Sequence, residues 1–436
     1  MKEALIVRSV HQHHRSAFIQ TGTNDSYAFD YLLNEAQSLL SRLHQVKPFS
    51  MTMPMVQGAA VSFRAMEQIS ELLENGKAAI FRSINEFIAT IEHSKKAHSD
   101  AAALQTRFSL LKLRYNSILD QLDIFADVLA QRSEHGVGIW LSGLDVLAED
   151  GLKACSPLAP SPALMVYIDR GHGAAIRRAN TKLPGGDTNP VAVIQVPRER
   201  MVGSGVASSL IHEIGHQAVE SIDLSNQLRR ALHLMRERQP EKPWHLYAQW
   251  ISEILADCWS MGHLGVTATM GLMGVVSLPS YFQFRLDMKG PHPPPYIRVK
   301  LSCAFGKALF PGKHWDRLWQ TWMQFYPKDE LPAPKLDTLA DLDSIENEFV
   351  QLVLGHKSPQ LKGNAFGKIL PTADRQPAQL KKLYKQWQND SATLDKSPPT
   401  LVFAVFGQAK YDLTIDANEE NALLSQILRN WAYRRK

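Results

Sequence analysis

The chain has 436 residues, with 48 basic and 43 acidic side chains and a formal net charge of +5. Its hydrophobic content of 44% is enough for sizeable buried cores, so the length predicts a folded protein of two or three domains. The small charge excess is spread along the chain, which excludes the concentrated basic surface of a nucleic-acid-binding protein.

Cysteine usage and the first residues bear on the compartment. Cys155, Cys258 and Cys303 lie far apart and form no CxxC pair, which argues against a disulfide framework and favours a reducing, cytoplasmic setting. The first residues contain only a short apolar run before charge and histidine intervene, so no signal peptide is predicted. The cluster at His11, His13 and His14 could catch a metal, but a flexible solvated arm is the favoured interpretation.

Helical periodicity dominates the first part of the chain. Apolar side chains recur there at steps of three and four in three blocks, which are residues 27–46, 61–94 and 101–131. These blocks predict long packed helices.

Two strands and a helix are predicted next. After the turn-rich connector SPLAPSP, the stretch ALMVYIDRG at 163–171 is rich in β-preferring residues. A second strand, VAVIQV at 191–196, follows the loop LPGGDTNP. Ser204 can then cap a helix that carries LIHEIGHQ at 210–217.

The remaining elements are predicted to be mostly helical. They are a helix at 224–238, a helix from Leu246 onwards, a helix at 299–309, a linker at PKDELPAPKLD, and helical segments within 338–436. Residues 258–284 contain no charged Asp, Glu, Lys or Arg and are long enough for a membrane span. Because this stretch also contains His263, four glycines and a proline, a buried core helix is the favoured interpretation.

The stretch LIHEIGHQ contains a pattern typical of a zinc site. His212 and His216 lie four residues apart, so on a helix they share one face and can hold one ion through ring nitrogens. Glu213 projects to the neighbouring side, where a general base can reach the water that such an ion activates. A chance HExxH on a surface helix is the competing interpretation. The apolar neighbours argue against it, because buried imidazoles need partners and a metal supplies one.

The stretch ISEILADCW supplies the expected third ligand. Glu253 and Asp257 lie four residues apart and face the same way on one helix. Glu253 could bind the ion, while Asp257 accepts the second ring N–H of a ligand histidine and fixes the orientation of that ring. Cys258 is interpreted as a packing residue.

HEIGH followed by EILAD resembles the gluzincin branch of zinc metallopeptidases, whose pattern is HExxH followed at a variable distance by ExxxD. Thirty-six residues separate the two motifs here, which departs from thermolysin's shorter interval, so the resemblance is to the superfamily. It implies one Zn²⁺ per chain and a small sheet whose edge strand, expected at 191–196, aligns a peptide by backbone hydrogen bonds.

HPPPYIR resembles the His-Pro and Arg element downstream of the third ligand in several gluzincins. That resemblance implies a structural or pocket-lining role for His292, Tyr296 and Arg298. A peptidase also needs a donor for the oxyanion. His292, Tyr296, Tyr281 and His263 are all candidates, with packing as the competing interpretation for each.

We therefore expect a predominantly helical α+β protein. An N-terminal helical region at 1–134 and a C-terminal helical region at 328–436 would flank a zincin-like metallopeptidase domain at 135–327. The expected activity is cytoplasmic hydrolysis of a peptide or protein substrate, with no nucleic-acid or membrane partner. Manganese or cobalt could replace zinc.

The alternative is a non-catalytic zinc-containing regulatory or protein-interaction module. Its helical regions would bind a partner, and its metal would be structural. Glu213 favours catalysis, because a structural site needs no base beside its ligands. The N-terminal helices could also shield a catalytic cleft until a regulatory partner binds, although a contribution to the catalytic core is the default interpretation.

Overall fold

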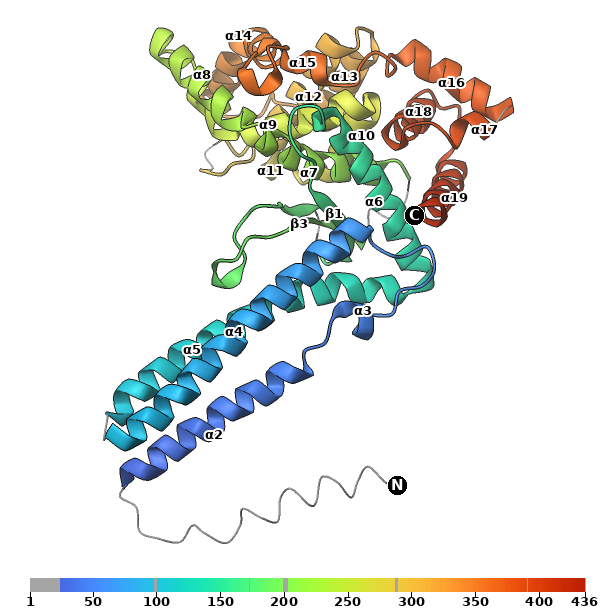
Figure 1. The fold of residues 1–436 in the computed structure, drawn as a ribbon. Helices are drawn as coiled ribbons and strands as arrows, with labels where there is room; N and C mark the ends of the chain where they lie inside the picture. Colours follow the sequence, from blue (N-terminus) through green and yellow to red (C-terminus); the bar gives the residue numbers. More distant parts are fainter. Residues whose placement is uncertain are drawn as a thin grey trace. The chain divides into compact units, whose positions relative to one another are not determined.

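The computed structural model describes residues 24–97, 100–171, 173–198, 203–286, 289–389 and 391–435. The prediction of a predominantly helical α+β fold is confirmed. Most of the described residues lie in helices, and a small sheet of three strands accompanies them (Figure 1). The histidines at 11, 13 and 14 lie outside the described residues. The chain divides into two compact units, which are Met1–Thr52 with Glu71–Asp123, and Met53–Ser70 with Ile124–Lys436.

The first unit is built from long amphipathic helices. Its elements are α2 (Asn24–Gln45), α3 (Phe49–Thr52) and the greater parts of α4 (Phe63–Ala97) and α5 (Ala101–Ala130). The predicted helical blocks are confirmed to within three residues at each end. Their apolar stripes form a core of their own, in which Phe87 stacks on Phe108 with ring centroids 5.6 Å apart.

The sheet of the second unit has the order β1-β3-β2. Its strands are β1 (Ala163–Asp169), β2 (Ala175–Arg177) and β3 (Val191–Pro197). β1 runs parallel to β3, and β2 runs antiparallel to it. Both predicted strands are confirmed. The expectation that 191–196 forms an edge was wrong, because the short strand β2 folds back beside β3 and leaves β3 in the centre.

Side chains cap the outer edge of β1. The Gln131 amide donates to the carbonyl oxygen of Ile168 over 2.8 Å and accepts from the N–H of Ile168 over 2.9 Å. The Asp145 carboxylate accepts from the N–H of Val166, whose carbonyl oxygen accepts from Arg132. Because the outward backbone groups of Val166 and Ile168 are already paired, a further strand cannot pair with this part of the edge.

Helices make up the rest of the second unit (Figure 1). They are α6 (His135–Leu152), α7 (Gly205–Ser221), α8 (Leu224–Arg238), α9 (Trp244–Leu264), α10 (Val266–Val276), α11 (Ser280–Gln283), α12 (Pro295–Leu309), α13 (His314–Phe325), α14 (Ala333–Gly355), α15 (Phe366–Ile369), α16 (Pro377–Asn389), α17 (Ser391–Leu394), α18 (Pro399–Tyr411) and α19 (Ala417–Arg434). α7 packs against α9, α10 and α6, and thus lies within the core of this unit.

The charge-free stretch at 258–284 is divided among several elements. α9 ends at Leu264, and α10 begins at Val266 after Gly265, whose φ of +57° favours glycine. Trp259, Met261 and Leu264 are buried in the core of the unit. Within the described part of the chain, no helix is both long and apolar enough to cross a membrane.

Three further expectations need correction or qualification. PKDELPAPKLD is not a continuous linker, because α14 begins at Ala333 and tolerates Pro334 in its first turn. Ser204 occupies the N-cap position of α7, but its side chain makes no capping hydrogen bond. The C-terminal stretch 328–436 lies in the same compact unit as 135–327, with α18 packed against α9 and α19 against α6.

Candidate metal centre

The close packing of α7 on α9 depends on the glycine within HEIGH. A Cβ atom added at Gly215 would lie 2.8 Å from the Cα of Ala256 and 2.9 Å from the Cβ of Trp259. Only glycine allows the two backbones to approach so closely. The approach brings His212 and His216 on α7 within reach of Glu253 on α9.

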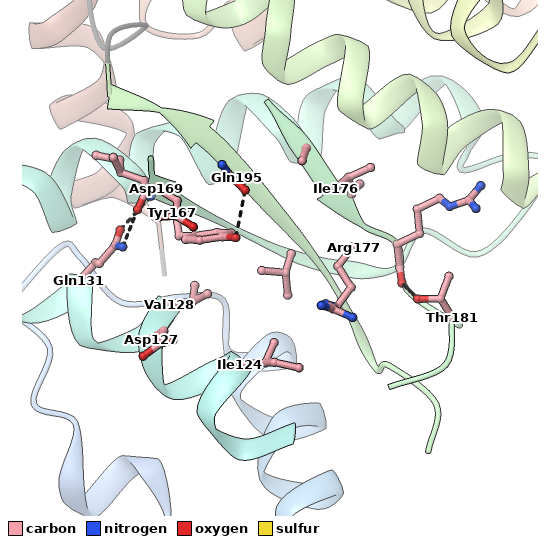
Figure 2. A pocket seen from close by; sticks show the side chains of 14 residues that line it. Ile124, Asp127, Val128, Gln131, Tyr167, Asp169, Ile176, Arg177, Thr181 and Gln195 are labelled. Carbon is pink, nitrogen blue, oxygen red and sulfur yellow. Dashed lines mark hydrogen bonds between the residues drawn. The ribbon is translucent and has the colours of Figure 1, made fainter. Parts of the chain in front are cut away.

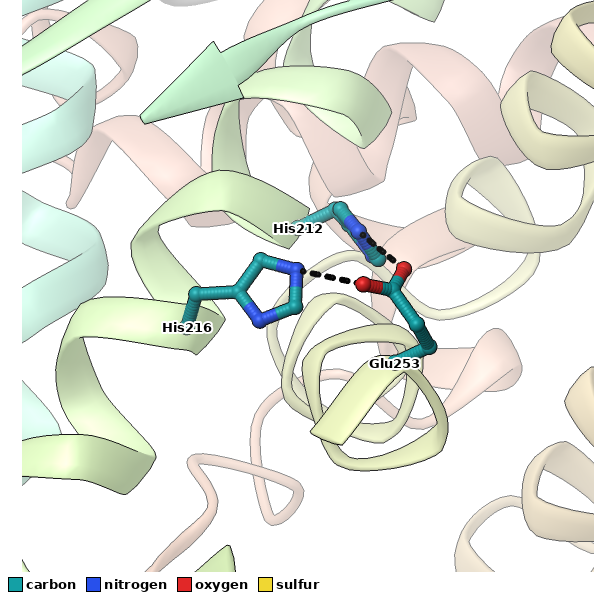
Figure 3. Close-up of side chains that lie close together, drawn as sticks. All are labelled: His212, His216 and Glu253. Atoms are coloured by element: carbon teal, nitrogen blue, oxygen red, sulfur yellow. Dashed lines mark ion pairs between the residues drawn. The ribbon is translucent and has the colours of Figure 1, made fainter. Parts of the chain in front are cut away.

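The three predicted ligands converge. Figure 3 shows the Glu253 carboxylate facing both imidazole rings. Each of its oxygens lies 3.4 Å from a histidine Nε2, one on His212 and the other on His216. One donor atom from each residue can be chosen so that all three lie within 4.8 Å of one another.

This donor set is suited to a metal ion. Two ligand atoms placed about 2.1 Å from a tetrahedral ion are about 3.4 Å apart, and each histidine Nε2 lies at that distance from a different Glu253 oxygen. Two imidazole nitrogens and one carboxylate oxygen are also donors that zinc accepts readily. The group formed by His212, His216 and Glu253 can therefore hold one metal ion.

Asp257 and Arg298 support the first ligand. The Nδ1 atom of His212 lies 2.8 Å from an Asp257 oxygen. Arg298, on α12, donates to both oxygens of Asp257 over 2.6 and 2.9 Å, and its Nη2 lies 3.6 Å from Glu253. Arg298 therefore holds the Asp257 carboxylate in place, and Asp257 in turn fixes the orientation of the His212 ring. Groups outside the ligand set commonly orient metal ligands in this way.

Protonation of the metal-free centre follows from these contacts. Burial disfavours the charged imidazolium of His212, but the charge of the adjacent Asp257 carboxylate and hydrogen bonds with Asp257 and Glu253 together outweigh burial and raise the pKa of His212 to about 9. For Glu253, burial favours the neutral acid, but hydrogen bonds from the two histidines hold its pKa below the usual range. A metal ion must displace the His212 proton, so its binding weakens as the pH falls.

The partner of the second histidine was missed by the sequence analysis. The Oγ atom of Ser252 lies 3.4 Å from Nδ1 of His216. Ser252 immediately precedes Glu253 on α9, so one turn of this helix both supplies a ligand and contacts another. A serine before the glutamate is too common a feature for the sequence alone to assign this contact.

The ligands line a cleft of about 570 Å³. Glu213 also lines it, as do residues of β2 and α10. The Glu213 side chain is mostly buried, as are His212 and Glu253, so the centre lies at the bottom of the cleft and not on an exposed face. The predicted base and the predicted ligands therefore share one cavity.

The remaining site candidates divide into two groups. His292 lines the cleft, with its Nε2 3.5 Å from a Glu253 oxygen, and Arg298 lines it as well. Tyr296 is not a cleft residue, because it packs between the rings of Phe284 and Trp319.

Neither Tyr281 nor His263 borders this cavity. Tyr281 lines a separate pocket beside α11, and His263 is buried against Trp259. Among the oxyanion candidates, only His292 thus borders the cleft.

Comparison with known proteins gave no relative. A scan against protein-family models, a search of curated proteins and a search of solved structures found no match.

Substitution of Gly215 tests the helix approach. We expect Gly215→Val to force α7 and α9 apart and to lower the zinc that the protein retains to a small fraction of the wild-type amount, because the candidate ligands come from both helices. Elemental analysis of purified protein measures this loss. Gly136→Val on α6 is the control, because a Cβ at Gly136 meets no atom within 4 Å. Equal zinc content in both variants would contradict the expectation.

His263 makes the fold sensitive to acid. Burial lowers its pKa from 6.5 to about 4, so the unfolded chain binds a proton here that the folded chain refuses between these values. Above pH 6.5 His263 therefore does not change the free energy of unfolding. Between pH 6.5 and pH 4 its titration lowers that free energy by up to about 3 kcal/mol. We expect the unfolding free energy of His263→Gln, measured by urea titration, to depend less steeply on pH in this window. The exposed His233→Gln should retain the wild-type slope, and an unchanged slope in His263→Gln would contradict this account.

Proposed function

We propose that this protein is a zinc-dependent peptidase with a zincin-like catalytic domain. His212, His216 and Glu253 would hold one Zn²⁺, and Glu213 would serve as the general base. The observation that carries the proposal is that this ligand set opens onto a cleft which Glu213 and a sheet edge also line.

The chemistry divides between the ion and the chain. Bound zinc supplies a Lewis acid that polarises a peptide carbonyl and acidifies water. Glu213 accepts a proton from the attacking water and returns it to the leaving amine. Asp257 and Arg298 keep His212 oriented, and His292 reaches the cleft from the loop before α12, where it can donate to the oxyanion.

Strand β2 provides a means of aligning the substrate. The outer edge of β1 is capped by side chains, whereas Ala175 and Ile176 of β2 line the cleft. An extended peptide can add to β2 by backbone hydrogen bonds, as peptides do at open sheet edges. Gln217, which follows His216, accepts from the N–H of Ala179 over 2.9 Å and so ties the chain after β2 to the metal-binding helix.

The open cleft also favours catalysis over a purely structural metal. Structural zinc sites are closed by four protein ligands, whereas catalytic sites keep one position for water or substrate. Here three ligands border a cavity of about 570 Å³. This supports the peptidase over the non-catalytic regulatory module.

Metal dependence tests the proposal. Untagged wild-type protein should contain one zinc per chain and cleave members of a mixed peptide library. Chelation should abolish cleavage, and added zinc should restore it. Protein that binds one zinc but cleaves no peptide would count against the peptidase and in favour of the regulatory module.

A further inference from the structure

A second cavity also borders β2 (Figure 2). Its volume is about 810 Å³, and it is lined by the end of α5 and by one face of the sheet. Ala175, Ile176 and Arg178 border both this cavity and the metal cleft. A peptide paired with β2 would therefore lie beside residues that border both cavities.

The sheet register assigns Arg177 to the second cavity. Ala175 pairs with Gln195 and Arg177 pairs with Val193, and all four residues line that cavity. Ile176 lies between them and pairs with the fully buried Ile194, on the opposite face. Because side chains alternate along a strand, a peptide residue directly opposite Arg177 shares its face and projects into the same cavity.

The charge nearest to such a residue is positive. Arg177 is exposed, and none of the ion pairs among the described residues involves it, whereas Arg178 pairs with Glu220 over 2.9 Å. Asp169, the carboxylate on β1, stands two strands further from the peptide, about 10 Å beyond Arg177 at the usual strand spacing. Asp127 lies on α5, across the cavity from the sheet. Arg177 is therefore the charged side chain on β2 itself that shares a face with the opposing peptide residue and has no ion-pair partner among the described residues.

We propose that Arg177 determines substrate specificity by selecting extended peptides with Asp or Glu at the position opposite it. This inference rests on the proposed peptidase function and names the substrate class of the same site. Carboxylate and guanidinium would face each other across two adjacent strands. The competing explanation is that Arg177, as an exposed charge on an edge strand, only prevents that edge from pairing with other chains. That role would give no preference for one peptide over another.

A charge-swap experiment tests the assignment. Extended peptides that differ only in Glu, Gln or Lys at one scanned position are compared by kcat/KM. At one position the kcat/KM of the wild type should be about tenfold higher for the Glu peptide than for the Lys peptide. An opposite-charge pair across strands strengthens binding by up to about fivefold, and a like-charge pair weakens it. Arg177→Gln should bring the ratio close to one, and Arg177→Glu should invert it. Lys382→Glu on α16 makes the same change in net charge outside both cavities and should keep the wild-type ratio.

Binding provides a second readout that does not require turnover. The same peptides, labelled with a fluorophore, are titrated against Glu213→Gln alone and combined with each Arg177 substitution, and their Kd values should follow the same order. If the wild type cleaves peptides with a ratio that neither Arg177 substitution changes, the specificity inference fails and the peptidase stands. If no peptide is cleaved and none binds, both proposals fail.

Discussion

Glu213→Gln should lower peptide cleavage by about 10²- to 10⁴-fold, the usual contribution of a positioned acid–base group, while zinc content stays at one ion per chain. Glutamine keeps the size of the side chain but cannot accept the proton of the attacking water. His212, His216 and Glu253 remain in place, because Glu213 lines the cleft without belonging to the metal-binding group. Peptide cleavage rates and elemental analysis on the same preparation measure the two quantities together.

The matched control is Glu237→Gln. Glu237 is an exposed glutamate on α8 and does not line the metal cleft, so the same chemical change there should leave both quantities at wild-type values. Cleavage by Glu213→Gln at the wild-type rate would show that Glu213 is not the general base. Loss of zinc together with activity would instead assign Glu213 a role in holding the ligands.

The convergence of the metal centre could be predicted because its geometry is largely local. Residues four apart share a helix face, which fixes His212 relative to His216 and Glu253 relative to Asp257. Bringing the two pairs together required tertiary packing, and the only sequence guide to it was the resemblance to gluzincins. The close approach at Gly215 is the physical reason that the pairs meet.

Elements without a periodic pattern escaped prediction. α6 is buried on nearly all sides, so its apolar residues follow no stripe and give no helical period. β2 has only three residues, which is too short for an alternating pattern to stand out. Because β2 gave no signal, the peptide-aligning edge was predicted on β3, which lies in the centre of the sheet.

The aromatic and histidine candidates show a different limit. Tyr281, Tyr296 and His263 were considered as oxyanion donors because their chemistry allows it. Their positions depend on how α9, α11 and α12 pack, and none of the three lines the metal cleft. The chemistry of a side chain identifies it as a candidate oxyanion donor, but only the tertiary structure shows whether it lies at the cleft.

Asp145→Asn should destabilise the second unit by about 3–5 kcal/mol, the typical cost of leaving a buried charge without its partner. Asp145 is fully buried and accepts two hydrogen bonds from Arg132, one from the N–H of Val166 and one from Arg435. Arg132 is itself fully buried, so removing the carboxylate leaves a guanidinium without its counter-charge in the core.

The loss would be measured as the free energy of unfolding in urea, with the exposed Asp337→Asn on α14 as a control expected to change it by less than about 0.5 kcal/mol. A change below about 1 kcal/mol in Asp145→Asn would mean that Arg132 is satisfied by its backbone partners alone. The predicted loss would identify this buried pair as the contact that joins β1, α6 and the chain's last residues into one core. Zinc binding should then fail only at temperatures where the unit unfolds, since Asp145 does not line the cleft.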